Sequence, residues 1–385
     1  MEERSVREIV RGAGERSGGA RRAGQSFLAG RRLRALRHCR AGRCFRGLPL
    51  LLLCLALAFS SAGCGEKTAE PVPSEEPGRS GRLRIGIVFD SFLAERWERD
   101  REIFTSAANA LGADVIVGNA NSDAERQAEI VDQMVSDGIP VIVIVPVDSS
   151  TLVRPVERAH AAGAKVIAYD RMIQNAAPDL YVTFDSGLAG KYMAKTLNER
   201  LPEHGSYLVL CGSGTDHNVS LMNHGFSSVI RSDLRCLSSV YCENWSDEAA
   251  YEYLDRHQEF LRRADAVVCG NDMIAEQAVK ALAEIRRAGQ VVITGQDADL
   301  GACQNIVRGT QTMTVYKPIE LEAGNAARAA VQLAKGEKVE AVRTVRDGNR
   351  EIPALSFDPV LVTRENLDDT VIKDGFHLKE EVYLN

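Results

Sequence analysis

The sequence has few of the features that carry covalent catalysis or metal chemistry. No GxSxG, HExxH or GxxxxGK motif occurs in its 385 residues, and no Ser, His and Asp set suggests a hydrolytic triad. The stretch CGSGTDH at 211–217 comes nearest to a phosphate-binding loop, but it lacks the lysine and the full spacing. The nine cysteines show no metal-site spacing. These absences argue against an enzyme and predict neither a cofactor nor a metal.

The charge of the chain is divided unevenly. The net charge is −6, but residues 1–47 contain thirteen arginines and four glutamates, so the remainder carries about −15. An acidic folded part is a poor match for nucleic acid, because phosphate backbones attract a basic surface. With 45% apolar and 26% charged residues the composition is ordinary for a globular protein, and the length allows two cores.

An uncharged apolar run at 48–59 follows the arginine-rich stretch. It is short for a membrane span and typical of a signal-peptide core. The next residues, SSAGC, resemble the lipobox of bacterial lipoproteins, in which cleavage precedes a cysteine that becomes lipidated, here Cys64. Ser61 stands where that pattern usually has leucine, so plain secretion is the alternative. We predict a signal region with an arginine-rich extension over 1–63 and a flexible tether rich in Pro, Gly, Ser and Glu over 64–82.

Five cysteines lie beyond the tether, and the redox state of four of them can be addressed from the sequence. Cys211 and Cys269 each end a strand-like run, and we predict that both are buried thiols. Cys236 and Cys242 are close in sequence, and export permits a disulfide between them. For that pair, free thiols and a disulfide both remain open.

Short runs rich in β-branched residues alternate with amphipathic stretches from Leu83 onward. In the stretch 123–138 the apolar residues share one helix face and a glycine ends the last turn. Eight apolar runs form two sets of four: 83–89, 114–119, 141–145 and 165–169, then 206–212, 238–244, 266–271 and 291–295. Continuous apolar strands separated by helices indicate parallel sheets covered on both faces. We therefore predict an α/β fold with two doubly wound parallel-sheet lobes.

A ninth strand and a helix follow at 312–336, and the tail beyond them is strand-like and less regular. We assign 83–184 and 317–350 to an N-terminal lobe, and 185–316 and 351–385 to a C-terminal lobe. Open parallel sheets bind ligands at the carboxyl ends of their strands, because loops and helix N-termini converge there.

Polar side chains follow most of these runs at their carboxyl ends. The candidates are Asp90, Asp170, Arg171, Asn218, Asn271, Asp272, Gln296 and Asp297. A helix N-cap is the alternative for each single Asp or Asn, and a solvated turn is the alternative for Asp170 with Arg171. Capping does not explain Arg171, which has no acceptor to offer a helix N-terminus.

The two tryptophans, Trp97 and Trp245, also lie beyond strand ends, one in each half of the chain. A tryptophan is more often a core residue than a binding platform, and that alternative stays open here. Carboxylates, amides, an arginine fork and indole rings that converge on a cleft match a polyol. Arg and Asp bind neighbouring hydroxyls in pairs, and an indole face packs on the C–H surface of a sugar.

Five motifs carry a resemblance to a known family: ERWERDREIF, AYDRMI, TGQDADL, GTQTMTVYKPI and DTVIKDGFH. They occur in this order between Leu83 and His377 and closely resemble the D-xylose-binding branch of the periplasmic binding proteins of bacterial ABC sugar importers, which share the ribose-binding fold. The resemblance implies two lobes joined by three crossover strands that close on one sugar. It implies delivery of that sugar to a membrane permease as the partner. From the signal core and SSAGC we predict an exported protein anchored through lipidated Cys64, and we expect a monomer.

The resemblance also implies a set of sugar contacts. These are Asp90, Arg96, Asp170, Arg171, Asn218, Trp245, Asn271, Asp297 and Lys317, and we add Trp97 because of its position just beyond the first strand. Where the family has a second acidic residue after Asp90, this chain has Ser91, so xylose, arabinose, ribose and glucose remain open as ligands.

Three function classes are compatible with such a fold. The first is a solute-binding lipoprotein for import. The second is a sugar-sensing protein without a transport role, such as a repressor or a chemoreceptor-linked receptor, but a repressor carries a helix-turn-helix where this chain has an apolar run and a tether. The third is a sugar-acting enzyme, for which Asp170 and Asp297 could imitate a carboxylate pair without any supporting motif. We expect the first.

Overall fold

A computed structural model describes residues 81–384 of the protein. These residues belong to one compact unit. The predicted signal region, most of the predicted tether and the predicted lipidation site Cys64 lie outside the described residues.

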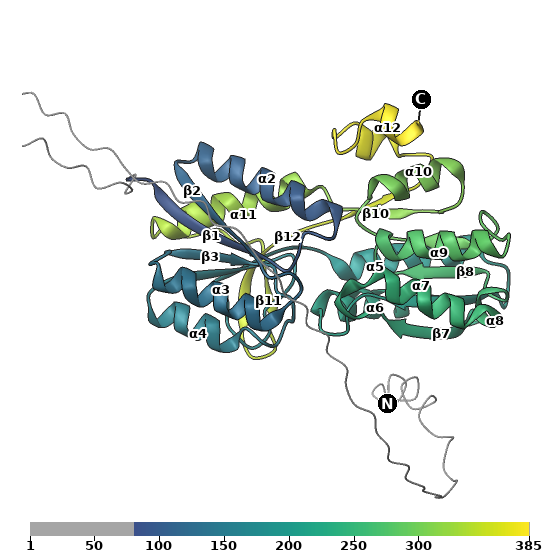
Figure 1. Ribbon diagram of the computed structural model, residues 1–385, viewed down its shortest axis with the longest axis horizontal. Helices are drawn as coiled ribbons and strands as arrows, with labels where there is room; N and C mark the ends of the chain where they lie inside the picture. Colours follow the sequence, from purple (N-terminus) through teal and green to yellow (C-terminus); the bar gives the residue numbers. More distant parts are fainter. Residues whose placement is uncertain (1–80, 385) are drawn as a thin grey trace, which may run out of the picture. The chain divides into compact units, whose positions relative to one another are not determined.

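The first lobe is built on a seven-stranded sheet (Figure 1). Its strands in spatial order are β11 (Arg343–Arg346), β12 (Glu351–Phe357), β5 (Leu180–Phe184), β4 (Lys165–Tyr169), β3 (Val141–Ile144), β1 (Leu83–Phe89) and β2 (Ala113–Asn119). All neighbours are parallel except β11 and β12, which form an antiparallel hairpin. Helices α2 (Glu95–Ala110) and α11 (Ile319–Ala334) pack on one face, and α3 (Ala124–Ser136) and α4 (Val153–Ala161) on the other.

The second lobe is built on a four-stranded parallel sheet. Its strands in spatial order are β7 (Arg235–Tyr241), β6 (Ser206–Cys211), β8 (Ala266–Cys269) and β9 (Val292–Thr294). The helices of this lobe are α5 (Ser186–Arg200), α6 (His217–Ser227), α7 (Asp247–Arg256), α8 (Gln258–Leu261), α9 (Asp272–Glu284) and α10 (Leu300–Arg308), with a single 3₁₀ turn, η1 (Glu243–Trp245), after β7.

A smaller ladder and a helical tail complete the second lobe. Strands β10 (Thr314–Tyr316) and β13 (Val360–Val362) are antiparallel. The tail contains η2 (Asp368–Ile372) and α12 (Lys379–Tyr383), and its apolar residues pack against β10, β13 and α10 in one cluster.

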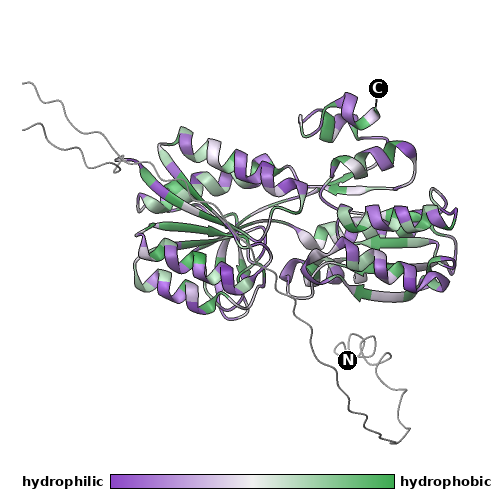
Figure 2. Ribbon diagram, in the orientation of Figure 1, coloured by the Kyte–Doolittle hydropathy of each residue, from purple (hydrophilic) through white to green (hydrophobic). Residues whose placement is uncertain are grey.

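The chain passes between the two sheets three times. The passages lie between β5 and α5, between β10 and α11, and between β12 and β13. The α/β fold with two doubly wound lobes and crossover strands is therefore confirmed. The strands are largely hydrophobic while the helices present one apolar and one polar side (Figure 2), as sheets covered by helices on both faces require.

Two predictions about the sheets were wrong. The first sheet has seven strands and not four, because β5 and the β11–β12 hairpin complete it. The predicted lobe boundary after residue 350 cuts that hairpin, whereas β12 pairs with β5 and buries Ile352 and Ala354 in the first lobe. Hairpin partners stay in one sheet because their ladder hydrogen bonds join them, so the chain leaves the first lobe after Phe357.

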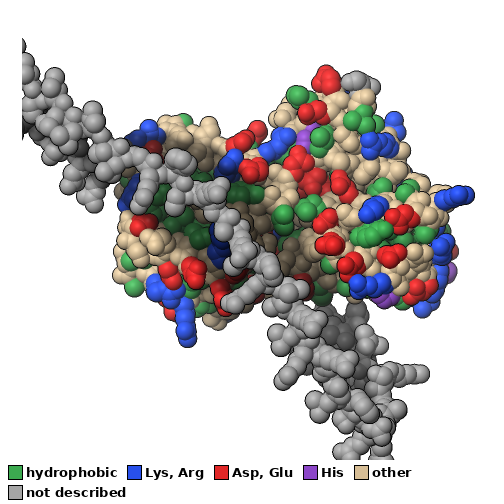
Figure 3. All heavy atoms as spheres, viewed as in Figure 1, with side chains coloured by type: hydrophobic (Ala, Val, Ile, Leu, Met, Phe, Trp, Pro, Cys, Tyr) green, Lys and Arg blue, Asp and Glu red, His purple; other side chains and the backbone are tan. Residues whose placement is uncertain are grey.

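The cysteines between residues 81 and 384 are all free thiols. Cys211 and Cys269 are buried, as predicted, and Cys236 and Cys242 do not form a disulfide. No helix in this part of the chain is long and apolar enough to cross a membrane. On the face of the described residues seen in Figure 3, lysines and arginines are interspersed with acidic side chains and form no continuous basic surface.

Candidate functional site

A cavity of about 420 Å³ lies where strand ends of both sheets converge. Its size falls within the usual range of small-molecule sites. All ten side chains predicted from the sequence line it: Asp90, Arg96, Trp97, Asp170, Arg171, Asn218, Trp245, Asn271, Asp297 and Lys317. Their role in ligand binding stays a prediction, but the structure brings every one of them to the same place.

The topology explains why residues so far apart in sequence meet. Asp90, Asp170 and Lys317 come directly after, respectively, β1, β4 and β10. Parallel strands end at one edge of a sheet, so Asp90 and Asp170 share that edge of the first sheet, while Lys317 follows β10, which pairs with β13 in the second lobe. The first turns of α2, α6 and α9 supply further side chains from the same edges.

Trp97 has a different setting from the one predicted. It lies in the first turn of α2, it is only 4% exposed, and it packs in the core of the first lobe against Phe89. The open alternative of a core residue therefore applies to Trp97, although its ring also borders the cavity. Trp245, in η1, is only partly buried and matches the predicted position at a strand end.

Arg96 is the centre of a buried ion network. Its guanidinium donates twice to Asp100 at 3.2 Å, once to Asp170 at 2.9 Å and once to Glu322 at 2.8 Å. Four of its five N–H donors are therefore occupied by carboxylates, and the side chain is 2% exposed. Burial opposes the charge of Arg96, but these carboxylates outweigh it and raise its pKa. The residue holds α2, β4 and α11 together at the floor of the cavity.

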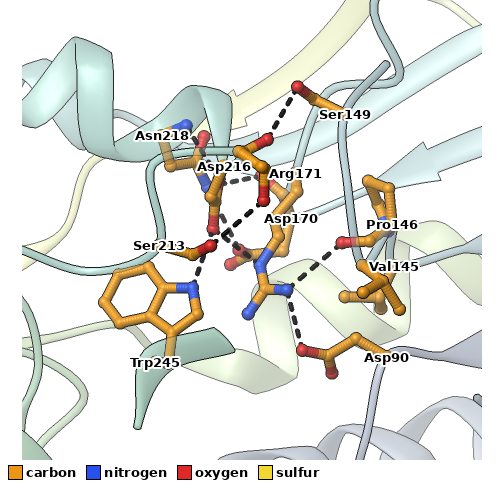
Figure 4. A network of polar contacts seen from close by, with 12 residues as sticks. Asp90, Val145, Pro146, Ser149, Asp170, Arg171, Ser213, Asp216, Asn218 and Trp245 are labelled. Atoms are coloured by element: carbon orange, nitrogen blue, oxygen red, sulfur yellow. Dashed lines mark hydrogen bonds and ion pairs between the residues drawn. The ribbon is translucent and has the colours of Figure 1, made fainter. Parts of the chain in front are cut away.

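Arg171 joins the two lobes (Figure 4). Its Nη1 donates to Asp90 at 2.7 Å and to the Pro146 carbonyl at 3.2 Å, while its Nε is 2.8 Å from Asp216 Oδ2 in the second lobe. The indole Nε1 of Trp245 donates to the same Asp216 oxygen at 3.2 Å. Among the described residues, Nη2 of Arg171 has no hydrogen-bond acceptor, so it is available to a ligand.

Asp170 occupies a strained backbone conformation. Its φ is 57°, in the left-handed region that residues other than glycine rarely adopt. Its carbonyl oxygen accepts hydrogen bonds from Thr183 at 2.7 Å, Tyr181 at 2.9 Å and Asn218 at 3.0 Å, and these hold the strained turn. Burial alone would raise the pKa of the carboxyl, but Lys317, Arg96 and Arg171 together lower it to about 2. Asp170 is therefore ionised over the whole physiological range.

The second lobe contributes groups with fewer partners. Asp297 has a φ of 100° and its Oδ1 accepts no hydrogen bond. Lys317 Nζ lies 3.2 Å from that oxygen as an ion pair without the alignment of a hydrogen bond. Asn271 caps α9 by accepting from Ile274 N at 3.0 Å, so the capping alternative holds for it, and it also borders the cavity.

Several functional neighbours were not predicted from the sequence. Asp216 pairs with Arg171, while Asp100 and Glu322 neutralise Arg96. Asp216 carried a local signal, since it is the N-cap of α6 and its Oδ1 accepts from Asn218 N at 2.9 Å. Glu322 has no such local signal, because the residues next to a helical glutamate do not show whether it is buried or exposed. Burial raises the pKa values of all three carboxyls.

The described part of the chain, residues 81–384, contains no group of three or more His, Cys, Asp or Glu side chains placed to hold a metal ion. The polar atoms that face the cavity are nitrogen donors and carboxylate or amide oxygens from both lobes. This mixture suits a neutral ligand with many hydroxyl groups, because each hydroxyl both donates and accepts.

Comparison with known proteins gives consistent results. The family described as periplasmic binding protein domain matches residues 85–338. The chain is 39% identical over 307 residues to the D-xylose-binding periplasmic protein of Haemophilus influenzae, covering 78% of this chain and 92% of that protein. It is 36% identical over 339 residues to the protein of the same name from Escherichia coli, covering 86% and 98%.

A solved structure also matches. The carbohydrate transporter solute binding protein of Chloroflexus aurantiacus, in complex with D-glucose, aligns with a TM-score of 0.72 at 26% identity. The alignment covers 78% of this chain and 98% of that one.

Proposed function

Because the chain belongs to the periplasmic binding protein family, we propose that it is an exported solute-binding protein that captures D-xylose and delivers it to an ABC importer. The observation that carries the proposal is the convergence of ten predicted polyol contacts on one cavity. The names of both relatives support xylose as the sugar. The family consists of binding proteins, so the chain is not an enzyme.

The sugar contacts divide between donors, acceptors and an aromatic face. Arg171 Nη2 and Lys317 Nζ donate to hydroxyl oxygens, Asp297 Oδ1 accepts from a hydroxyl, and the Trp245 ring packs on sugar C–H groups. Because these groups come from both lobes, a bound sugar stabilises the state in which the lobes are closed on it. Small-angle scattering should then show compaction on addition of sugar.

Isothermal titration with D-xylose, arabinose, ribose and glucose tests the proposal. We expect D-xylose to bind with the highest affinity and one molecule to bind per chain. Titrations without heat for all four sugars, on protein whose fold is verified by circular dichroism, would overturn it.

The mature protein is expected to be a monomer attached to the membrane through lipidated Cys64, with residues 64–82 as a tether. The lipobox-like SSAGC supports this part of the proposal. Mass spectrometry of the protein from its native host should find a lipid on Cys64 as the first residue. A soluble protein with an unmodified Cys64 would contradict the anchor without affecting the sugar site.

A further inference from the structure

The motif DTVIKDGFH at 369–377 resembles the family, yet none of its residues lines the cavity. It lies in the C-terminal tail, where Val371 is fully buried and the Phe376 ring packs 5.2 Å from the Tyr316 ring. His377, the last residue of the motif, is 2% exposed. A buried histidine needs partners for its ring nitrogens, and those partners indicate its role.

One ring nitrogen of His377 contacts the loop that carries Asp297. Nε2 lies 2.8 Å from the carbonyl oxygen of Ala298, and since a carbonyl only accepts, Nε2 carries the proton. Burial lowers the pKa of His377, so the ring is neutral near pH 7 and Nδ1 is an acceptor. Nδ1 faces Arg99 Nη2 at 3.5 Å, on α2 of the first lobe.

The loop that carries Asp297 and Ala298 needs contacts that hold its backbone. Asp297 and Ala298 have φ values of 100° and 58°, two consecutive residues in the left-handed region without a glycine. Such a backbone conformation is strained and persists only where surrounding contacts hold it. Thr314 Oγ1 accepts from the Ala298 N–H at 3.2 Å, and the buried Asp272 accepts from the Asp299 N–H at 3.1 Å.

His377 donates to the Ala298 carbonyl at 2.8 Å, and the thiol of Cys303 is a second, weaker donor to the same oxygen at 3.5 Å. Hydrogen bonds therefore hold both backbone groups of Ala298. Its N–H belongs to the peptide bond with Asp297, and its carbonyl belongs to the peptide bond with Asp299. The Asp297 side chain leaves the backbone at this point and lines the cavity, and its Oδ1 is buried without a hydrogen bond. A rotation of the Ala298 peptide would change the direction of that carboxylate.

We propose that His377 is a positioning residue that holds the Asp297–Ala298 backbone and so directs the Asp297 carboxylate at the bound sugar. This inference rests on the proposed function, because it assigns Asp297 to sugar binding. The loop that His377 supports also contacts the first lobe. Glu95 of α2 accepts from Leu300 N at 3.1 Å and lies 3.8 Å from His377 Nδ1, so α2 packs on the same loop that His377 supports.

The test compares His377→Leu with His377→Gln in D-xylose titrations. Leucine removes the donor, and we expect D-xylose affinity to fall about tenfold, the effect of one lost hydrogen bond. Glutamine places an N–H at a similar reach and should restore most of the affinity. Tyr383→Phe is the matched control, since it removes the bond to Asp368 in the same tail without touching the loop, and its affinity should equal that of the wild type.

A second pair of variants separates positioning from general destabilisation. In an Asp297→Asn background, His377→Leu should produce little further loss, because the carboxylate that it positions is already gone. Equal losses in both backgrounds, or wild-type affinity in His377→Leu, would overturn the proposal. Should the leucine variant not fold, His377→Asn, whose amide is too short to reach Ala298, takes its place in the same comparison. A wild-type protein that binds no sugar contradicts the proposed function instead, which separates the two failures.

Discussion

The two halves of the cavity differ in how their polar groups are satisfied. In the first lobe, Arg96 uses four N–H donors on neighbouring carboxylates and Asp170 is paired with Arg96. In the second lobe, the buried Oδ1 of Asp297 accepts no hydrogen bond and has only ion pairs, with Lys317 Nζ at 3.2 Å and Arg96 Nη1 at 3.8 Å. Asp216 is the exception, since it pairs with Arg171 across the cavity.

This difference separates stability from binding. A group that is already paired contributes to the folded state with or without ligand, and removing its partner leaves a buried charge uncompensated. An acceptor that makes no hydrogen bond in the free protein contributes no hydrogen-bond energy until a ligand hydroxyl reaches it. Substitutions in the first-lobe half should therefore lower stability, while those in the second-lobe half should mainly lower affinity.

The largest effect is expected from Arg96→Met. It leaves Asp100, Asp170 and Glu322 buried without their common cation, and we expect the free energy of unfolding to fall by about 3–5 kcal/mol without sugar. Chemical denaturation measures this loss. Arg99→Met is the control, because Arg99 lies in the same helix and its side chain is partly exposed. It should lower the free energy of unfolding by less than about 1 kcal/mol. Similar losses of unfolding free energy for the two variants would contradict the proposed difference between the two halves of the cavity.

Asp297→Ala should show the opposite pattern. Its Oδ1 has no hydrogen bond to lose in the free protein, and Lys317 keeps Asp170 as a second carboxylate, so stability should change less than in Arg96→Met, while D-xylose affinity falls by about 1.5–3 kcal/mol. Titration calorimetry and thermal unfolding of the sugar-free variant measure the two quantities. A large drop in the melting temperature of the sugar-free variant would mean that Asp297 stabilises the fold, as the structural ion pairs do.

The tryptophans give a smaller version of the same contrast. Trp245→Ala should weaken sugar binding by about 1–3 kcal/mol and change stability less, because its ring is only partly buried. Trp97→Ala removes a core side chain and should destabilise the fold whether or not sugar is present. With two indoles in the chain, sugar should also shift the intrinsic fluorescence. Emission that is unchanged by every sugar would contradict the placement of Trp245 against the ligand.

The smallest effect concerns pH. The folded-state pKa of Asp170 is about 2, below its ordinary value of 3.8, so its stabilising contribution is complete above about pH 4 and is lost as pH falls towards 2. Between pH 7 and pH 3 this loss amounts to about 1 kcal/mol. The stability difference between wild type and Asp170→Asn should therefore shrink by that amount at pH 3. A difference that is independent of pH would mean that Asp170 is not held by its cations.

Local sequence was sufficient for much of the architecture and for the location of the site. Hydrophobic runs and helix periodicity identified the alternation of strands and helices, because burial on both faces of a parallel sheet imposes them residue by residue. Polar residues after those runs identified the cavity, because parallel strands end at a common edge. The five motifs added the family and the individual side chains.

What remained undetermined depends on contacts between residues far apart in the chain. The strand β12 joins the first sheet through pairing with β5, which is more than 160 residues away, and no local pattern states that choice. Glu322, Asp100 and Asp216 look like surface acids in the sequence and become charge partners only when three helices meet the strand ends. The sequence by itself thus determined ten of the side chains that line the cavity. Only the tertiary structure decided which of them are already neutralised, because pairing depends on distances of a few ångströms that the order of residues does not contain.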